Sequence, residues 1–345
     1  MKNRLRSCIR PACAVLLALG IIWVILILAQ YDAALAFKAL FEAGFKNIKA
    51  FGNVLNRACP LLFTGLAVAF ALRGNMINIG AEGQFLAGTM AATWTGIAFF
   101  PLPGFILIPL MLLMGAFAGA AWGFFPAILK AKLGVSEVIT TIMFNYVALH
   151  IIGALVRGPL QDITQAEPQS YPIAKQAFLP SIIPGTKMHF GFLLGIIFAV
   201  VLYILLFKTY FGYEVRAVGH SHTAAKALGI SVNRTSIYAM LIAGGMAGIG
   251  GAIEIGYNHY LLESISPGYG FTAIAVAILA SNNPIGVIFS SLLFGFLSAG
   301  STAMQRAAGV SATFVEVFQG LIVIFIAIAA ETNTVQRRRF KKINL

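Results

Sequence analysis

Long uninterrupted apolar runs, separated by short polar segments, make up most of this chain. Runs of about 18 or more apolar residues are long enough to cross the hydrocarbon core of a bilayer as helices. Apolar and polar residues do not alternate one by one, as they do in outer-membrane barrels. The pattern therefore predicts an all-α fold, a polytopic transmembrane helical bundle. The ten predicted spans are residues 11–30, 54–72, 77–100, 104–128, 136–157, 190–209, 235–257, 271–281, 284–302 and 313–331.

The eighth of these segments, 271–281, is too short for a full crossing, and we expect a broken or half helix there. The sequence SPGYG precedes it at 266–270, and SNNP follows it at 281–284. Broken helices at matching places in two halves of a chain are typical of a transport path. The two halves show no residue-by-residue repeat.

A second polar break, RGNMINIGAEGQ at 73–84, interrupts the apolar pattern earlier in the chain. Irregular backbone at membrane depth is expected only where it lines a cavity or is buried in protein. An acid such as Glu82 within a span is costly unless it is paired or hydrated. The alternative is a simple turn between two spans, with Asn78 as a helix cap. Further polar groups within predicted spans, Asn145, Tyr146 and Glu254, are each typical of helix–helix hydrogen bonds.

Glycines recur at every fourth position in two spans. Gly115, Gly119 and Gly123 do so in the fourth span, and Gly244 and Gly248 in the seventh. Glycine at this spacing lets helix backbones approach closely in lipid. The run GGMAGIGG is therefore predicted to pack helices; it lacks the GK[ST] ending and the preceding strand of a phosphate-binding loop.

Basic residues predict the orientation. With the N-terminus inside, 16 of the 24 Lys and Arg residues fall on the cytoplasmic side, and RRRFKK at 337–342 is the strongest group. An even number of spans then places both termini in the cytoplasm. Residues 31–51 and 158–189, the second with five prolines, become the long external loops. No segment resembles a separate soluble domain, so we expect 1–345 to form one transmembrane domain.

Composition excludes several classes of protein. The chain is 59% hydrophobic and 10% charged, unlike a soluble domain. Its formal charge of +13 does not indicate nucleic-acid binding, because the basic residues lie at span ends. Cys8, Cys13 and Cys59 have no metal or redox spacing and are interpreted as unpaired thiols. The basic N-terminus and the apolar run that follows could be a signal peptide, but the run is long enough to span, and we favour an uncleaved first helix.

Residues 211–234 form a polar island among the apolar runs. Within it, HSHTAAKALG at 220–229 combines good helix formers with a glycine stop. It is either a helix that docks a soluble partner or a long solvated loop. No HExxH, GxSxG or Walker A sequence occurs in the chain, so any energy from nucleotide hydrolysis must come from another subunit.

Four stretches together resemble bacterial ABC importer permeases of the branched-chain amino acid and simple-sugar superfamily. They are NMINIGAEGQFLAG at 75–88, GVSEVITTIMFNYVAL at 134–149, VRAVGHSHTAAKALGISVNR at 215–234 and GYGFTAIAVAILASNNPIG at 268–286. The resemblance covers nearly all of the chain after the first span. It is strongest to permeases of nucleoside importers that work with a binding lipoprotein of the basic membrane protein type.

The resemblance implies a multi-pass permease in the bacterial inner membrane. It implies an ABC ATPase partner that holds the ATP, a second permease subunit and an external solute-binding lipoprotein, with no cofactor bound by this chain. The implied ATPase-coupling residues are Arg216, Gly219, Ala224, Ala225 and Gly229. His220 departs from the acid or amide that many members carry at that position.

The solute cavity is expected near both polar breaks. Its candidate residues are Asn75, Asn78, Glu82, Gln84, Asn145, Tyr269 and Asn282. Three alternatives remain open: a simple-sugar or branched-chain amino-acid permease, an ion-coupled transporter with Glu82 or Glu254 as proton site, and an assembly scaffold without transport.

Overall fold

The fold is known from a computed structural model. It describes residues 16–183, 186, 188–311 and the separate positions 314, 317, 318, 320, 321, 324 and 325. The predicted span at 313–331 and the basic sequence at 337–342 lie largely or wholly outside these residues.

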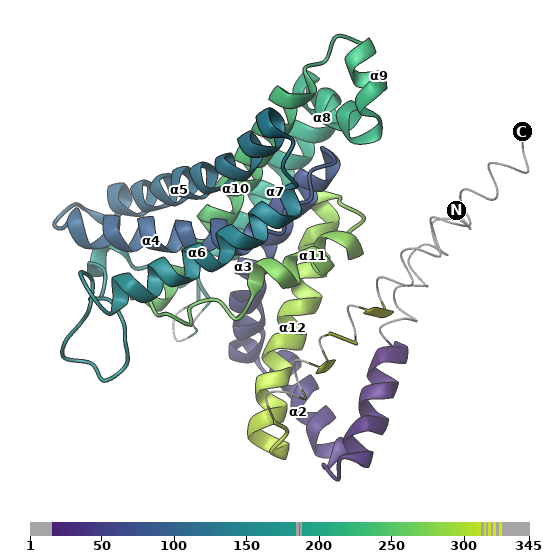
Figure 1. The fold of residues 1–345 in the computed structure, drawn as a ribbon. Coiled ribbons are helices and arrows are strands. Elements are labelled where there is room, and N and C mark those ends of the chain that lie inside the picture. Colours follow the sequence, from purple (N-terminus) through teal and green to yellow (C-terminus); the bar gives the residue numbers. More distant parts are fainter. Residues whose placement is uncertain are drawn as a thin grey trace, which may run out of the picture. The chain divides into compact units, whose positions relative to one another are not determined.

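Helices make up nearly all of the regular structure in the described ranges (Figure 1). A helix at Leu16–Leu28 is followed by α2 (Ala33–Phe45), α3 (Ile48–Arg73), α4 (Ala81–Ala98), α5 (Gly104–Leu133), α6 (Glu137–Val156), η1 (Lys175–Ala177), α7 (Gly191–Lys208), α8 (Tyr210–His220), α9 (His222–Ala227), α10 (Val232–Asn258), α11 (Tyr269–Leu279) and α12 (Pro284–Ala308). Extended pairing in these ranges is limited to isolated bridges. The predicted all-α fold is confirmed.

Six of these helices are long and apolar enough to cross a membrane: α3, α5, α6, α7, α10 and α12. The helix at Leu16–Leu28 and α11 are shorter apolar helices. The short helix expected at 271–281 is therefore confirmed as α11, with 11 residues. The count of ten spans and the cytoplasmic location of the termini remain predictions.

The chain divides into two compact units, which are described separately: residues 1–57 with 292–345, and residues 58–291. In the first unit, α2 packs against the part of α12 that belongs to it. The ring of Phe296 lies 5.4 Å from that of Phe45, and a Cβ atom on Gly44 would meet the Phe296 ring. Part of the predicted external loop 31–51 is thus a helix, which Asp32 begins by accepting a hydrogen bond from the Leu35 amide at 2.9 Å.

The second unit is built on close packing between α4, α5 and α10, which lie side by side (Figure 1). A Cβ atom on Gly119 would overlap the carbonyl oxygen of Gly244, and one on Gly248 would overlap that of Gly115. A Cβ atom on Gly88 of α4 would also overlap the Gly248 backbone. The predicted glycine contacts are confirmed, and they place the polar N-terminal turn of α4 inside the unit.

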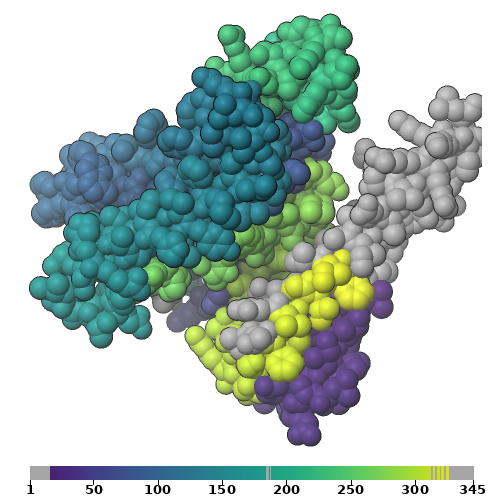
Figure 2. Space-filling view, in the orientation of Figure 1, coloured from purple at the N-terminus to yellow at the C-terminus, as the bar shows by residue number. Residues whose placement is uncertain are grey.

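The polar island at 211–234 differs from the single docking helix that we expected. It holds two helices, α8 and α9, which Ser221 separates. The Ser221 hydroxyl begins α9 by accepting a hydrogen bond from the Ala224 amide at 3.3 Å. Gly229 follows with a φ of +78°, so the glycine stop is confirmed. We call residues 210–231, which hold α8, α9 and the turn after them, the helical lobe; it lies at the N-terminal end of α10 and projects there (Figures 1 and 2).

Candidate functional site

The polar break between α3 and α4 is irregular, as expected, and much of it is buried. Asn78 and Gln84 pair through their amides: Asn78 Nδ2 donates to Gln84 Oε1 at 2.9 Å, and Gln84 Nε2 donates to Asn78 Oδ1 at 3.2 Å. The alternative of Asn78 as a helix cap is wrong, because Gly80 occupies the N-cap position of α4. The paired amides satisfy each other in a site closed to solvent.

Asn145 of α6 joins this break from another helix. Its Oδ1 accepts a hydrogen bond from the Gly83 amide at 2.8 Å, and its Nδ2 donates to the Ile79 carbonyl at 3.0 Å. One buried side chain therefore satisfies two backbone groups on either side of the start of α4. This is a structural task, and it fixes the break against α6.

Glu82 lies in the first turn of α4 and is 7% exposed. Its Oε2 accepts a hydrogen bond from the Gly270 amide at 2.6 Å, in the first turn of α11. A carboxylate at a helix N-terminus satisfies an unpaired amide and complements the positive end of the helix dipole. Glu82 thus links the two polar breaks that the sequence placed in separate halves of the chain.

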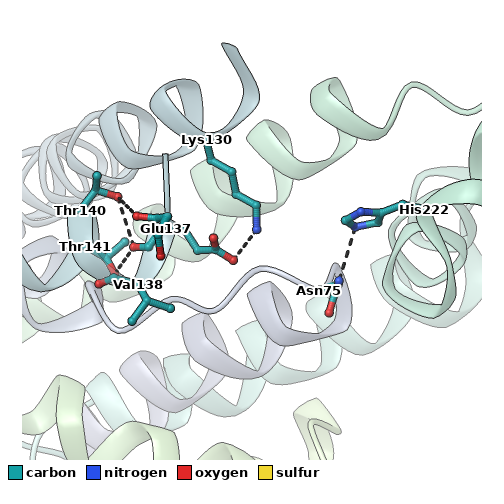
Figure 3. Close-up of polar contacts among 8 residues, drawn as sticks. Asn75, Lys130, Glu137, Val138, Thr140, Thr141 and His222 are labelled. Carbon is teal, nitrogen blue, oxygen red and sulfur yellow. Dashed lines mark hydrogen bonds and ion pairs between the residues drawn. The ribbon is translucent and has the colours of Figure 1, made fainter. Parts of the chain in front are cut away.

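The structure gathers five of the seven predicted pathway residues and separates two. Tyr269, whose ring lies 5.6 Å from that of Phe85, neighbours the contact between Glu82 and Gly270. We call Asn78, Glu82, Gln84, Asn145 and Tyr269 the polar cluster. Asn282 lies beyond the opposite end of α11, about 16 Å away along an 11-residue helix. Asn75 lies beside the helical lobe, where its Nδ2 is 3.4 Å from His222 Nε2 (Figure 3).

Arg73, the first residue of the polar break but not one of the predicted pathway residues, connects α3 to the end of α11. Its Nε donates to the Asn282 carbonyl at 2.8 Å and its Nη2 to the Ser281 carbonyl at 3.0 Å. Ser281 and Asn282 both have positive φ, 52° and 55°. An arginine that donates to carbonyls at a helix C-terminus fits the negative end of the helix dipole. Its position at the polar end of a predicted span was the only signal in the sequence.

The helical lobe contacts the same end of α3. A Cβ atom on Gly219 would overlap the carbonyl oxygen of Arg73, so α8 approaches the α3 backbone as closely as glycine allows. Val218, Ala225 and Ile230 of the lobe form a small apolar core with Val232, the first residue of α10. Ala225 is 1% exposed, so our expectation that it presents itself to a partner is wrong. Ala224 and Gly229 are exposed, and so is Leu228 at 65%.

A different set of contacts closes the opposite end of α10. The Ile173 amide donates to the His259 carbonyl at 2.8 Å, and the Leu179 amide to that of Gly256 at 3.0 Å. His189 is buried there, which lowers its pKa to about 4 and keeps the imidazole neutral. Arg157 and Glu263 form an ion pair at the end of α6.

Most of the described polar groups of the site are hydrogen-bonded to backbone groups or to each other. Among these residues, no three His, Cys, Asp or Glu side chains come together as a metal site. Glu254, the alternative proton site, accepts a hydrogen bond from Asn258 Nδ2 at 2.9 Å.

Long apolar helices around buried, glycine-flanked polar breaks define a multi-pass membrane protein. Residues 50–327 match the family model for the permease component of branched-chain amino acid transport systems. The chain belongs to this family and is a permease subunit of an ABC transporter.

Curated relatives match over most of their length. The chain is 36% identical to the guanosine ABC transporter permease protein NupP of Bacillus subtilis, over 95% of each chain. It is 36% identical to the glucose ABC transporter permease protein TsgB13 of Haloferax volcanii, over 92% of this chain and 86% of the relative. It is 33% identical to the nucleoside ABC transporter permease protein NupB of Lactococcus lactis, over 95% and 93%. A solved structure, PsaBC from Streptococcus pneumoniae in complex with Fab, matches with a TM-score of only 0.42 at 16% identity, over 86% of this chain and 94% of that one.

Proposed function

We propose that this chain is the permease of an ABC importer that moves nucleosides into a bacterial cell across the inner membrane. The observation that carries the proposal is near full-length similarity to NupP and NupB, whose names specify guanosine and nucleosides. The same identity to a glucose permease favours a simple sugar as the second candidate solute.

The proposed assembly has two permease subunits, of which the second is a different chain. An ABC ATPase binds and hydrolyses ATP on one side, and a lipoprotein delivers the solute on the other. The helical lobe is the proposed docking element for the ATPase. Its apolar core gives it a fixed shape, and the exposed Ala224, Leu228 and Gly229 are suited to enter a groove on a partner.

The polar cluster is the proposed inner wall of the solute path. Its amides and carboxylate are already hydrogen-bonded to each other or to backbone groups, so solute would pass beside them only when helices separate. Motion of the lobe has a direct route to α11, because Arg73 contacts both the lobe and the carbonyls that follow α11. ATP-driven movement of the lobe would thus shift α11 and the cluster together.

Solute uptake tests the function. The full complex, reconstituted in vesicles with its ATPase and binding protein, is expected to accumulate radiolabelled guanosine only with ATP. An excess of unlabelled uridine should compete, whereas an excess of glucose should not. Competition by glucose alone would favour the sugar permease, and uptake by this chain alone under a proton gradient would favour an ion-coupled transporter.

The docking role has a separate test. Leu228→Asp places a charge on an exposed apolar position of the lobe and should reduce co-purification of the ATPase. Lys175→Asp, an exposed substitution at the opposite end of α10, is the control. Equal recovery of ATPase with the parent chain and with Leu228→Asp would reject the lobe as the docking element.

A further inference from the structure

Two arginines lie over the same aromatic ring, that of Phe207, where α3 and α7 meet the helical lobe. The guanidinium carbon of Arg73 lies 5.5 Å from the centroid of the Phe207 ring, and that of Arg216 lies 5.2 Å from it. Both distances are within the range of cation–π attraction. We call Arg73 and Arg216 the arginine pair. It is distinct from the polar cluster and from the exposed face of α9.

The charge of the arginine pair is not balanced within the described part of the chain. The ion pairs found there join Lys46 to Glu42, Lys130 to Glu137 and Arg157 to Glu263. Arg73 donates to two backbone carbonyls, which carry only partial charge. Arg216 makes no hydrogen bond to another described residue. Two neighbouring cations with spare donors predict an anion from outside these residues.

The surroundings of the arginine pair place it at the surface of the membrane. Phe207 and the exposed Lys208 end α7, a strongly apolar helix most of whose residues are not buried in the protein. Tyr210 and Tyr213 follow α7 directly in the chain, and the ring of Tyr238 of α10 lies 6.4 Å from that of Phe211; the three tyrosines are 75%, 47% and 55% exposed. Exposed tyrosines beside the basic end of a spanning helix mark the level of lipid headgroups.

We propose that the arginine pair binds the phosphate of an anionic phospholipid. Guanidinium groups bind phosphate through several N–H donors, and Lys208 adds positive charge beside the site. The acyl chains would lie along the outer face of α7, where Ile197, Val201 and Ile204 are 52%, 50% and 49% exposed. A small free anion would use the charges but would leave this apolar face uncovered.

The position of the site gives the bound lipid a structural consequence. Arg73 holds the turn after α11, and its own carbonyl contacts Gly219 of the lobe. A phosphate between the two arginines offsets their repulsion where α3, α7 and α8 converge. The bound lipid therefore stabilises the junction between the lobe and the spanning helices.

Native mass spectrometry of the full-length chain in detergent tests the proposal. The chain is titrated with phosphatidylglycerol or with phosphatidylcholine, and the fraction that retains lipid is compared. We expect preferential retention of phosphatidylglycerol, and a drop of about fivefold in its affinity in Arg216→Gln. Arg216 is chosen over Arg73 because its loss removes no described hydrogen bond. Arg234→Gln, which removes an exposed charge at the start of α10, should change little.

The following outcomes would overturn the proposal. An unchanged affinity in Arg216→Gln, or an equal drop in Arg234→Gln, would mean that net charge alone attracts the lipid. Displacement of phosphatidylglycerol by millimolar inorganic phosphate would show a free-anion site. Loss of ATPase co-purification in Arg216→Gln with lipid binding intact would show that the arginines meet an acidic protein surface.

A stability measurement is the control for folding. The melting temperature of both variants should match that of the parent in lipid-free detergent.

Discussion

At the scale of single residues, the structure adds most to the prediction for Glu82, which the sequence placed near the solute cavity. It caps the first turn of α11 through the Gly270 amide. Glu82→Gln keeps an acceptor but removes the charge, whereas Glu82→Leu removes both. Loss of a capping side chain costs about 0.5–2 kcal/mol, so we expect stability to fall from parent to Gln to Leu in denaturation in detergent.

Transport by the same two variants separates a capping role from a direct contact with solute. If Glu82 acts by holding α11, uptake should decline in step with stability, and Glu82→Gln should retain most of it. A Glu82→Gln variant that is as stable as the parent but inactive would instead indicate that the charge itself is needed. Normal stability and uptake in Glu82→Leu would contradict both roles.

Residue patterns predicted which polar groups are buried among the helices better than they predicted the hydrogen-bond partners of these groups. Asn78, Gln84 and Asn145 stood out as amides within apolar sequence, and the structure shows each of them hydrogen-bonded and buried. Nothing in the local pattern could pair Glu82 with Gly270, because 188 positions separate them. The contacts of Arg73 could not be predicted either, because its acceptors are distant backbone carbonyls, which every residue carries.

At the scale of elements, the crossing of α5 and α10 depends on which face each glycine occupies. A Cβ atom on Gly244 would overlap the Gly119 carbonyl, whereas one on Gly245 would come no closer than 3.5 Å to another element. Gly244→Ala should therefore lower the melting temperature strongly. Gly245→Ala should leave it unchanged or raise it, because alanine favours a helix over glycine by about 1 kcal/mol. Equal effects of the two substitutions would show that close backbone approach is not what holds these helices together.

In the helical lobe, the sequence predicted a helix but not which of its faces is buried. Helix formers and a glycine stop correctly predicted a helix within 220–229. The break at Ser221 and the packing against Ile230 and Val232 depend on the fold of the whole lobe. The family resemblance therefore placed Ala225 among the coupling residues, although its side chain is buried inside the lobe.

Paired tryptophan substitutions test this assignment of faces. Ala225→Trp should overpack the core of the lobe and destabilise it by about 1–3 kcal/mol. Ala224→Trp, on the exposed side, should leave the lobe folded and weaken only the docking of the ATPase. Limited proteolysis of the lobe measures the first effect, and ATPase co-purification measures the second. Increased proteolysis in Ala224→Trp alone would reverse the two faces.

At the scale of the whole molecule, the length of α10 sets the distance between the helical lobe and the segment that contains Lys175. It has 27 residues and is about 40 Å long, which exceeds a hydrocarbon core of about 30 Å. The lobe adjoins its first residue, and the segment that contains Lys175 is hydrogen-bonded to its last turn. Lys175 and His222 are both exposed. If α10 crosses the membrane, these two positions must lie on opposite sides.

Single cysteines at Lys175 and at His222, in a background without the native cysteines, test this arrangement. A membrane-impermeant maleimide applied to intact cells should label Lys175→Cys, and His222→Cys only after permeabilisation. The lobe would then face the compartment that holds ATP, as its proposed docking role requires. Labelling of both positions in intact cells would show that α10 does not cross, and the reverse pattern would invert the orientation that the basic residues predict.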